Sequence, residues 1–166
     1  MLLAATPKGI CALRFGGGPD PEGRGELGRE SLLAGLREEF PKATLVEDEG
    51  DLDGCVQTVT SYLRGERRRL DLTADLAPTA FQQKVWSALQ AIPYGETRSY
   101  AEVAEGIGRS TAARAVARAC AANPVALVVP CHRVVRSDGG LAGYRWGADR
   151  KRRLLEQEGA VRERPE

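Results

Sequence analysis

The segment PYGETRSYAEVAEGIGRSTAARAVARACAANP, residues 93–124, restricts the fold of this chain more than any other. A proline stands at each end, and proline is excluded from the interior of a regular helix. Between them, residues from about 100 and from about 110 to 123 favour helix, and Gly-Ile-Gly at 106–108 separates the two. Two short helices around such a turn are typical of a helix-turn-helix, although many helical bundles also contain helix pairs.

Further helices are expected on both sides of this segment. Thr79 can cap a helix that Pro93 ends, and its apolar residues share one face: Phe81, Val85, Leu89 and Ile92. The stretch GADRKRRLLEQEGA at 147–160 predicts another helix. The second half of the chain is therefore expected to be mostly helical.

The sequence of the first half predicts a small unit that contains both helices and strands. Apolar runs at 2–5 and 10–15 flank TPKG, which suits a type I turn and so predicts a hairpin. Apolar residues at helical spacing predict helices over about 32–40 and 52–63. We also expect short strands at 43–46 and 70–74, and a mobile loop at 16–28, where glycine and proline are frequent.

Together these elements predict an α+β fold with a boundary near Pro78. The expected domains are a small N-terminal α/β domain over residues 1–76 and a mostly helical C-terminal domain over residues 77–166, which contains the helix-turn-helix.

Charge is distributed unevenly along the chain. The net charge of +1 is the sum of −4 over residues 1–75 and +5 over residues 76–166. The second half is therefore the candidate anion-binding half. Arg114 and Arg118 lie one turn apart on an alanine-rich helix and could contact phosphates, or they could be solvated side chains on a packed helix.

The sequence also excludes several classes of protein. No stretch approaches the roughly 18 apolar residues of a membrane span, and the apolar start is too short for a signal peptide, so we expect a cytoplasmic protein without membrane contact. The four cysteines form no CxxC pair and there is a single histidine, which argues against zinc. We expect reduced thiols, with Cys11, Cys55 and Cys120 as packing residues.

The pair Cys131-His132 is the one candidate for chemistry. Apolar residues flank it in VALVVPCHRVV, and burial alone raises the pKa of a thiol and makes it inert. Cys131 becomes a nucleophile only if His132 takes its proton, either directly after a turn at Pro130 or through a water. A carboxylate should hold the other ring nitrogen, and Glu156 and Glu158 are both candidates.

The motif PCHRVV, followed by GYRWG and RKRRLLEQEG, resembles the O6-alkylguanine-DNA alkyltransferases, also called methylated-DNA-protein-cysteine methyltransferases. TAFQQKVW, IPYGETRSYAEVA and AARAVARACAANP match further family segments in the same order. The resemblance runs from about residue 79 to 159, is weaker in the first half through GICALRF, and implies a ribonuclease H-like N-terminal domain.

The resemblance implies a single-turnover transfer of an alkyl group from guanine O6, possibly also from O4-alkylthymine, to Cys131, without a cofactor. In this pattern His132 relays a proton through a water, and Glu158 is the matching glutamate. Asn123 matches the asparagine that ties the turn after the recognition helix to the active-site segment. Tyr100 matches the tyrosine whose hydroxyl serves the ring N3 of guanine.

The resemblance also implies how DNA is bound. Val134 and Arg145, with Cys131, match backbone groups that read the edge of the base, and Tyr144 matches a wall of the pocket. The helix-turn-helix lies in the minor groove of double-stranded DNA, and the alkylated nucleotide is flipped out of the duplex. Arg114 fills the space that this nucleotide leaves in the base stack. Ala112 and Ala113 belong to the alanines that allow close approach, and Arg118 is a possible additional phosphate contact.

Two further expectations concern assembly. No zinc is expected, although some relatives bind it, because the only histidine already has a role. The chain most resembles the C-terminal half of the bacterial adaptive-response regulator, yet we expect a monomeric, stand-alone repair protein rather than a trimmed regulator.

The alternative functions are a lesion-binding or regulatory DNA protein without transfer activity, and a cysteine hydrolase, which Cys131 and His132 alone would suggest.

Overall fold

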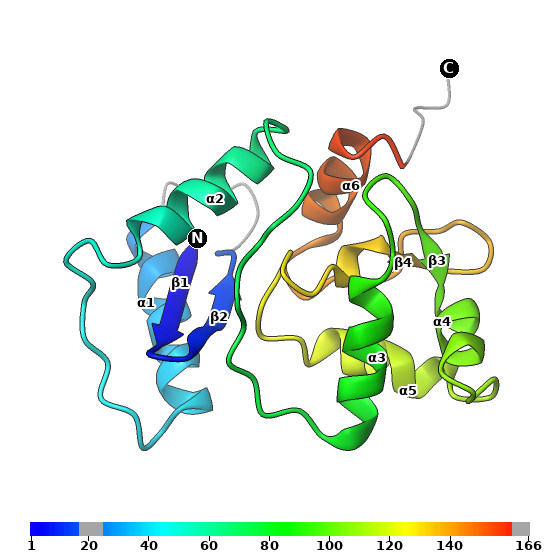
Figure 1. Cartoon of the computed structure of the whole chain (residues 1–166), viewed down its shortest axis with the longest axis horizontal. Coiled ribbons are helices and arrows are strands. Elements are labelled where there is room, and N and C mark those ends of the chain that lie inside the picture. Colours follow the sequence, from blue (N-terminus) through cyan, green and yellow to red (C-terminus); the bar gives the residue numbers. More distant parts are fainter. Residues whose placement is uncertain (17–24, 161–166) are drawn as a thin grey trace.

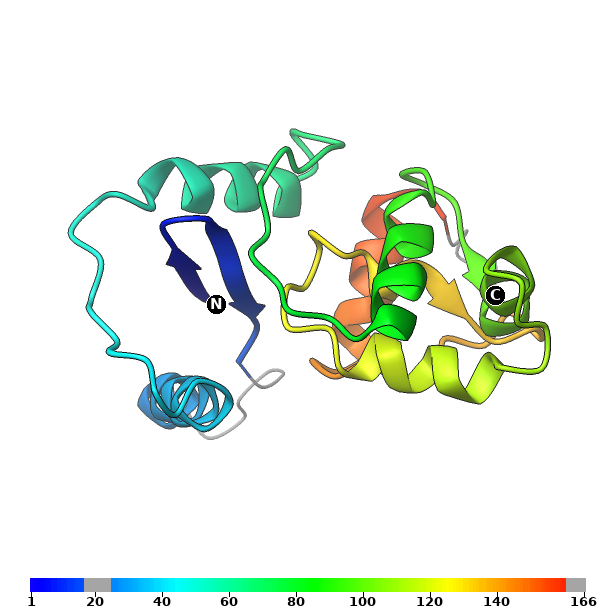
Figure 2. The same cartoon turned by 60° about the horizontal axis from the view of Figure 1, so that its bottom comes forward.

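An antiparallel hairpin begins the chain and forms the centre of its first half. In the computed structural model, which describes residues 1–16 and 25–160, β1 (Leu2–Thr6) pairs with β2 (Gly9–Arg14) around the expected turn. Leu3 lies opposite Leu13, and the register shifts at a bulge after Ala4. The hairpin lies between the helices α1 (Gly25–Glu39) and α2 (Asp53–Leu63) (Figure 2).

Three expectations for the first half need correction. Residues 43–46 form no strand, since they lack the hydrogen bonds of a ladder and Val46 is largely exposed. Residues 70–74 form only one bridge, from Ala74 to Ile10, with the Ile10 amide donating to the Thr73 carbonyl. Residues 25–28, expected in a loop, are helical. The rest of the expected loop, residues 17–24, lies outside the described residues.

The second half is mostly helical, as expected. Its elements in chain order are α3 (Ala80–Gln90), β3 (Arg98–Ser99), α4 (Tyr100–Gly106), α5 (Ala113–Ala121), the 3₁₀ turn η1 (Cys131–Arg133), β4 (Val134–Val135) and α6 (Ala148–Gln157). Thr79 caps α3 as predicted, in a capping box with Gln82. The two short helices flank the predicted break, although α5 begins three residues later than expected. Helix α3 packs on both α4 and α5 (Figure 1).

Strand β2 joins the two halves. Beyond its pairing with β1, its Leu13 amide donates to the Pro124 carbonyl, and the Ala126 amide donates to the Leu13 carbonyl. One cluster of buried apolar side chains runs through both halves, from Ile10 and Val59 to Val85 and Leu154. The segment that precedes η1 is therefore fixed against the hairpin of the first half. None of the helices in the described part of the chain is long and apolar enough to cross a membrane.

Candidate active site

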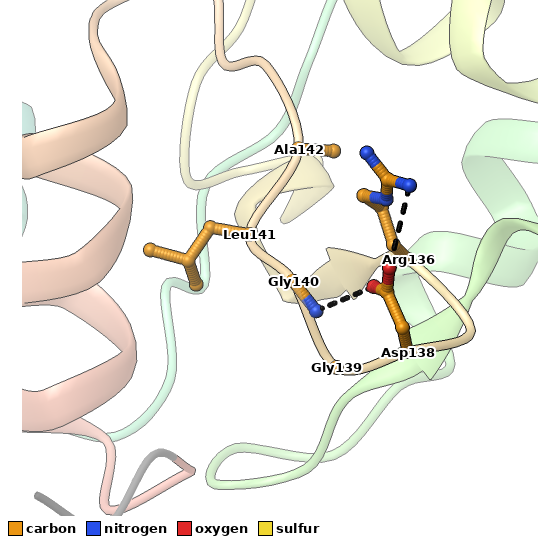
Figure 3. Close-up of a pocket in the computed structure, with 6 residues that line it drawn as sticks. All are labelled: Arg136, Asp138, Gly139, Gly140, Leu141 and Ala142. Atoms are coloured by element: carbon orange, nitrogen blue, oxygen red, sulfur yellow. Dashed lines mark hydrogen bonds and ion pairs between the residues drawn. The ribbon is translucent and has the colours of Figure 1, made fainter.

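A cavity of about 380 Å³ opens between α4, α5 and the segments around η1 and residues 142–145. Its lining contains two thiols, two phenols, one guanidinium and small residues: Tyr100, Ala117, Cys120, Ala121, Cys131, Ala142, Gly143, Tyr144 and Arg145. A second depression lies on the neighbouring loop 136–142, where Asp138 bonds Arg136 and the Gly140 amide (Figure 3). That depression has no thiol, hydroxyl or imidazole in its lining. The thiol-containing cavity is thus the candidate active site.

Cys131 lies at the first residue of η1, and its side chain is buried. The backbone turns after Pro130, which was one of the two alternatives that the sequence left open, so Cys131 and His132 do not alternate as on a strand. Asn123, which is fully buried, donates from Nδ2 to the Val129 carbonyl at 2.8 Å and to Cys131 Sγ at 3.3 Å. Its Oδ1 accepts from the Val125 amide. Asn123 therefore fixes the segment from Val125 to Cys131 and contacts the sulfur as well.

His132 faces away from solvent and pairs with Glu158, at the C-cap of α6. Its Nε2 lies 2.7 Å from Glu158 Oε1. Because Glu158 is ionised, Nε2 carries the hydrogen, which leaves Nδ1 as the basic nitrogen. That Nδ1 is buried and has no hydrogen-bond partner among the described residues. Of the two candidate carboxylates, Glu158 is thus the partner, while Glu156 is exposed.

Arg133 completes a buried network around the same carboxylate. Its Nε donates to Glu158 Oε2 at 2.8 Å, and its Nη1 donates to the Ile92 carbonyl at 2.6 Å. Tyr62, from α2, donates its hydroxyl hydrogen to Glu158 Oε1. The Gly95 amide donates to Oε2 at 3.3 Å. Glu158 therefore receives hydrogen bonds from both halves of the chain.

These contacts shift the pKa values of the groups at the site. Burial opposes the charge on Glu158, but hydrogen bonds from His132, Arg133 and Tyr62 lower its pKa to about 2. Burial lowers the pKa of His132, although Glu158 opposes this. Burial raises the pKa of the Cys131 thiol, against the Asn123 hydrogen bond and the positive charges of Lys151 and Arg145. In the resting protein Cys131 is therefore a thiol, and His132 is a neutral base.

Two tyrosines lie in the wall of the cavity. Ser99 caps α4 in a capping box with Glu102, which places Tyr100 at the first helical residue with its ring in the cavity. Burial and the nearby cysteines raise the pKa of Tyr100 to about 12, so its hydroxyl is a proton donor. The hydroxyl of Tyr144 is buried without a partner in the described part of the chain, and burial raises its pKa well above the usual value.

The remaining predicted residues lie around this centre. Val134 is buried in β4, and Arg145 is exposed at the cavity. Arg114 and Arg118 are both exposed on α5, one turn apart, and neither lines the cavity. Ala112 precedes α5 and Ala113 begins it, both half-buried. The cavity and the exposed arginines of α5 are thus separate features of the same helix pair.

Sequence reasoning missed three groups of the site. Tyr62 comes from a helix with no recognisable motif, and Arg133 and Lys151 lay inside quoted motifs without a role. Cys120, expected to be a packing residue, is buried but also lines the cavity. All four cysteines are free. Within residues 1–16 and 25–160, no three His, Cys, Asp or Glu side chains gather as a metal site requires.

Comparisons with known proteins agree on one group of relatives. Residues 80–160 match the family model described as the DNA binding domain of 6-O-methylguanine DNA methyltransferase. A methylated-DNA--protein-cysteine methyltransferase from Mycobacterium bovis is 47% identical over 136 residues, covering 79% of this chain and 82% of the relative. The crystal structure of Mycobacterium tuberculosis OGT in complex with DNA is 40% identical, with a TM-score of 0.75, and the match covers 95% of this chain and 85% of that one.

A longer relative also matches. The regulatory protein ada of Salmonella typhimurium is 46% identical over 157 residues, which cover 95% of this chain but 42% of the regulator. The bifunctional transcriptional activator/DNA repair enzyme Ada of Escherichia coli matches over 43% of its length. The chain thus spans less than half the length of these two relatives.

Proposed function

The chain belongs to the methylated-DNA-protein-cysteine methyltransferase family, and we propose that it repairs DNA by moving an alkyl group from guanine O6 onto its own Cys131. The observation that carries the proposal is the position of Cys131 in a cavity, next to a histidine held by a buried carboxylate. The relatives' names include both DNA repair and this methyltransferase activity. This reaction needs no cofactor.

In the proposed reaction the Cys131 sulfur attacks the alkyl carbon, forming the S–C bond as the C–O6 bond breaks. The electron pair of the broken bond remains on guanine. The thioether that results is not displaced by water, so each molecule reacts once. We expect the same chemistry on O4-alkylthymine only if the cavity admits that base.

Proton transfer from Cys131 precedes the attack. The thiol is buried, so its proton needs a base, and Nδ1 of His132 is the free basic nitrogen beside it. A bridging water would carry the proton from Sγ to Nδ1, while Glu158 stabilises the imidazolium through Nε2. Asn123, already bonded to Sγ, stabilises the developing thiolate.

The leaving guanine also requires a proton donor. Tyr100, whose pKa is about 12, is protonated at neutral pH and would donate to the ring N3. The proton held on His132 then restores the tyrosine through solvent, which balances the reaction. Tyr144 would form a wall against the flipped base, and the backbone of Val134 and Arg145 would read its edge.

The helix pair α4–α5 is the proposed helix-turn-helix, and it would lie in the minor groove of double-stranded DNA. Exposed Arg114 and Arg118 supply positive charge, and the half-buried Ala112 and Ala113 permit close approach. Arg114 would fill the space that the flipped nucleotide leaves in the stack. Arg118 would contact a phosphate.

We extend the proposal to the organisation of the molecule. Residues 1–76 would be a ribonuclease H-like domain and residues 77–166 the DNA-binding and alkyl-acceptor domain of a cytoplasmic monomer. Their shared core and the Tyr62–Glu158 contact support an N-terminal domain that stabilises the site.

The test is intact mass followed by peptide mapping, after mixing the protein with duplex DNA that contains one O6-methylguanine. The expected result is a gain of one methylene unit on the Cys131 peptide, saturating at one per protein, with none in Cys131→Ala. A wild-type protein that binds the lesion tightly without a mass change would instead be a lesion recogniser. Turnover of an ester or amide would indicate a hydrolase.

A further inference from the structure

Glu158 Oε1 is the oxygen on which the proposed proton relay depends, and three groups share it. His132 Nε2 lies 2.7 Å away, Arg133 Nη2 lies 3.3 Å away, and the Tyr62 hydroxyl donates to it. Of these three, only Tyr62 comes from the first half of the chain, at the last turn of α2. A hydrogen bond between residues 62 and 158 thus enters the candidate active site from another part of the fold.

Tyr62 acts on Arg133 as well as on Glu158. Its hydroxyl oxygen accepts a hydrogen bond from Arg133 Nη2 at 3.1 Å, while its hydrogen goes to Glu158 Oε1. Arg133 forms an unequal two-bond fork on the carboxylate, because Nε lies 2.8 Å from Oε2 while Nη2 lies 3.3 Å from Oε1. The Tyr62 hydroxyl gives Nη2 a second and closer acceptor at 3.1 Å, so the bond from Nη2 to Oε1 stays long.

We propose that Tyr62 is a positioning residue of the relay, because its hydroxyl holds Glu158 Oε1 toward His132 and keeps the bond from Arg133 Nη2 to that oxygen long. The proposal rests on the proposed function, since the relay is part of it. Without the hydroxyl, Arg133 Nη2 moves closer to Oε1, and the bond from His132 Nε2 lengthens. The imidazolium is then less stabilised and His132 is a weaker base toward Cys131.

Burial supports this role for the hydroxyl. Tyr62 and Glu158 are both buried, and Tyr62 is among the largest fully buried side chains of the described chain. Burial, followed by the charge and hydrogen bond of Glu158, raises the pKa of Tyr62, so the hydroxyl remains a donor. The other charged groups that act on His132 are Arg133 and Lys151.

The neighbouring Tyr94 offers a matched control. Its ring packs edge-on against Tyr62, with centroids 6.0 Å apart, and its hydroxyl donates to the Gln157 carbonyl at 3.2 Å. Tyr94→Phe and Tyr62→Phe each remove one hydroxyl that bonds the end of α6. Only the Tyr62 hydroxyl bonds the carboxylate, so the pair separates positioning from general support of α6.

The experiment measures the single-turnover rate of methyl transfer to Cys131 as a function of pH, in wild type and in both variants. Tyr62→Phe is expected to lower the plateau rate roughly tenfold and to move its acid limb to lower pH, because His132 becomes less basic. Tyr94→Phe is expected to leave the plateau rate and the position of the acid limb close to those of wild type. Equal behaviour of the two variants, or a wild-type profile for Tyr62→Phe, would overturn the proposal.

A second measurement needs no reaction. His132 is the only histidine of the chain, so ¹⁵N-histidine labelling gives one set of ring signals. In wild type we expect the Nε2–H form, with the proton signal far downfield because of the bond to Glu158. Tyr62→Phe should move that signal upfield, while Tyr94→Phe should not. An unchanged signal in Tyr62→Phe would refute the proposal even if that variant is less stable, and absence of transfer in wild type would refute only the proposed function.

Discussion

The ammonium group of Lys151 donates a hydrogen bond to the Val134 carbonyl over 2.5 Å, and the Lys151 side chain is fully buried. Burial lowers the pKa of Lys151, while negative charge on Cys131 and on Cys120 would raise it. The lysine therefore ties α6 to β4 and places positive charge near the candidate nucleophile.

Replacing Lys151 by Met should make Cys131 less reactive, since the thiolate loses a favourable charge. We expect alkylation of Cys131 by iodoacetamide at pH 7.5 to slow by roughly threefold to tenfold. Peptide mapping distinguishes Cys131 from Cys120. Arg152→Met, on the exposed side of the same helix, is the control; equal slowing in both would assign the effect to overall charge.

Glu158→Gln tests the relay directly. The amide keeps the shape of the side chain but cannot stabilise an imidazolium, so methyl transfer should slow by roughly a hundredfold. The affinity for undamaged duplex should stay within about twofold, because Glu158 is buried whereas the arginines of α5 are exposed. Fluorescence anisotropy and single-turnover kinetics measure the two. Parallel losses of binding and rate would contradict a relay role.

Much of the second half could be predicted from the sequence, because its signals are local. Thr79 and the proline at 93 bound α3, and the glycine-containing break separates α4 from α5. The strands expected at 43–46 and 70–74 did not form, because strand formation depends on a partner elsewhere in the chain and not on local signals. A short apolar run becomes a strand only when another strand pairs with it, and only Ala74 found such a partner.

The candidate site likewise contains residues that could be predicted from the sequence and residues that could not. Cys131 and His132 could be found because they are adjacent in an unusual apolar segment. From the residues alone Glu158 could not be separated from Glu156, since the choice depends on which side of α6 faces η1. Tyr62 is 96 residues from its partner in sequence, and no local pattern marks such a contact.

Acid should destabilise the fold in two steps. The pKa of His132 is lowered by burial, so the unfolded chain binds its proton first and stability falls as the pH drops below about 6.5. The pKa of Glu158 is about 2 in the folded protein, against a usual 4.5, so its contribution is lost as the pH falls from about 4.5 toward 2.

The Glu158 step amounts to about 3 kcal/mol, and urea unfolding at a series of pH values measures both steps. Because the chain has one histidine, His132→Gln should flatten the stability curve just below about pH 6.5. A curve that keeps its slope in this variant would assign the first step to other groups.

Gly95 should tolerate no side chain. Its φ is +82°, and a Cβ there would lie 2.9 Å from the Glu158 carbonyl oxygen. Gly95→Ala should therefore cost the roughly 1 kcal/mol of a left-handed backbone and at least as much again for displacing the end of α6. Gly108→Ala, with φ +70° and open space around the added Cβ, should show the backbone cost alone. Urea unfolding measures the free energy of unfolding of both variants. Equal losses would mean that the loop at residue 95 shifts enough to accommodate the added Cβ.

Arg114→Ala separates base flipping from chemistry. Arg114 is exposed on α5 and does not line the cavity, so its loss leaves Cys131 and the relay groups in place. If it fills the vacated stack, repair of O6-methylguanine in duplex DNA should slow by roughly tenfold or more, because the cost of unstacking is a few kcal/mol. Reaction with free O6-methylguanine, supplied as the base alone, should stay close to wild type. Arg118→Ala, one turn away with the same charge change, should weaken duplex binding in a salt-dependent manner and slow transfer only at subsaturating protein. If Arg114→Ala lowers the rate of transfer equally with duplex DNA and with the free base, Arg114 supports the cavity and has no part in flipping.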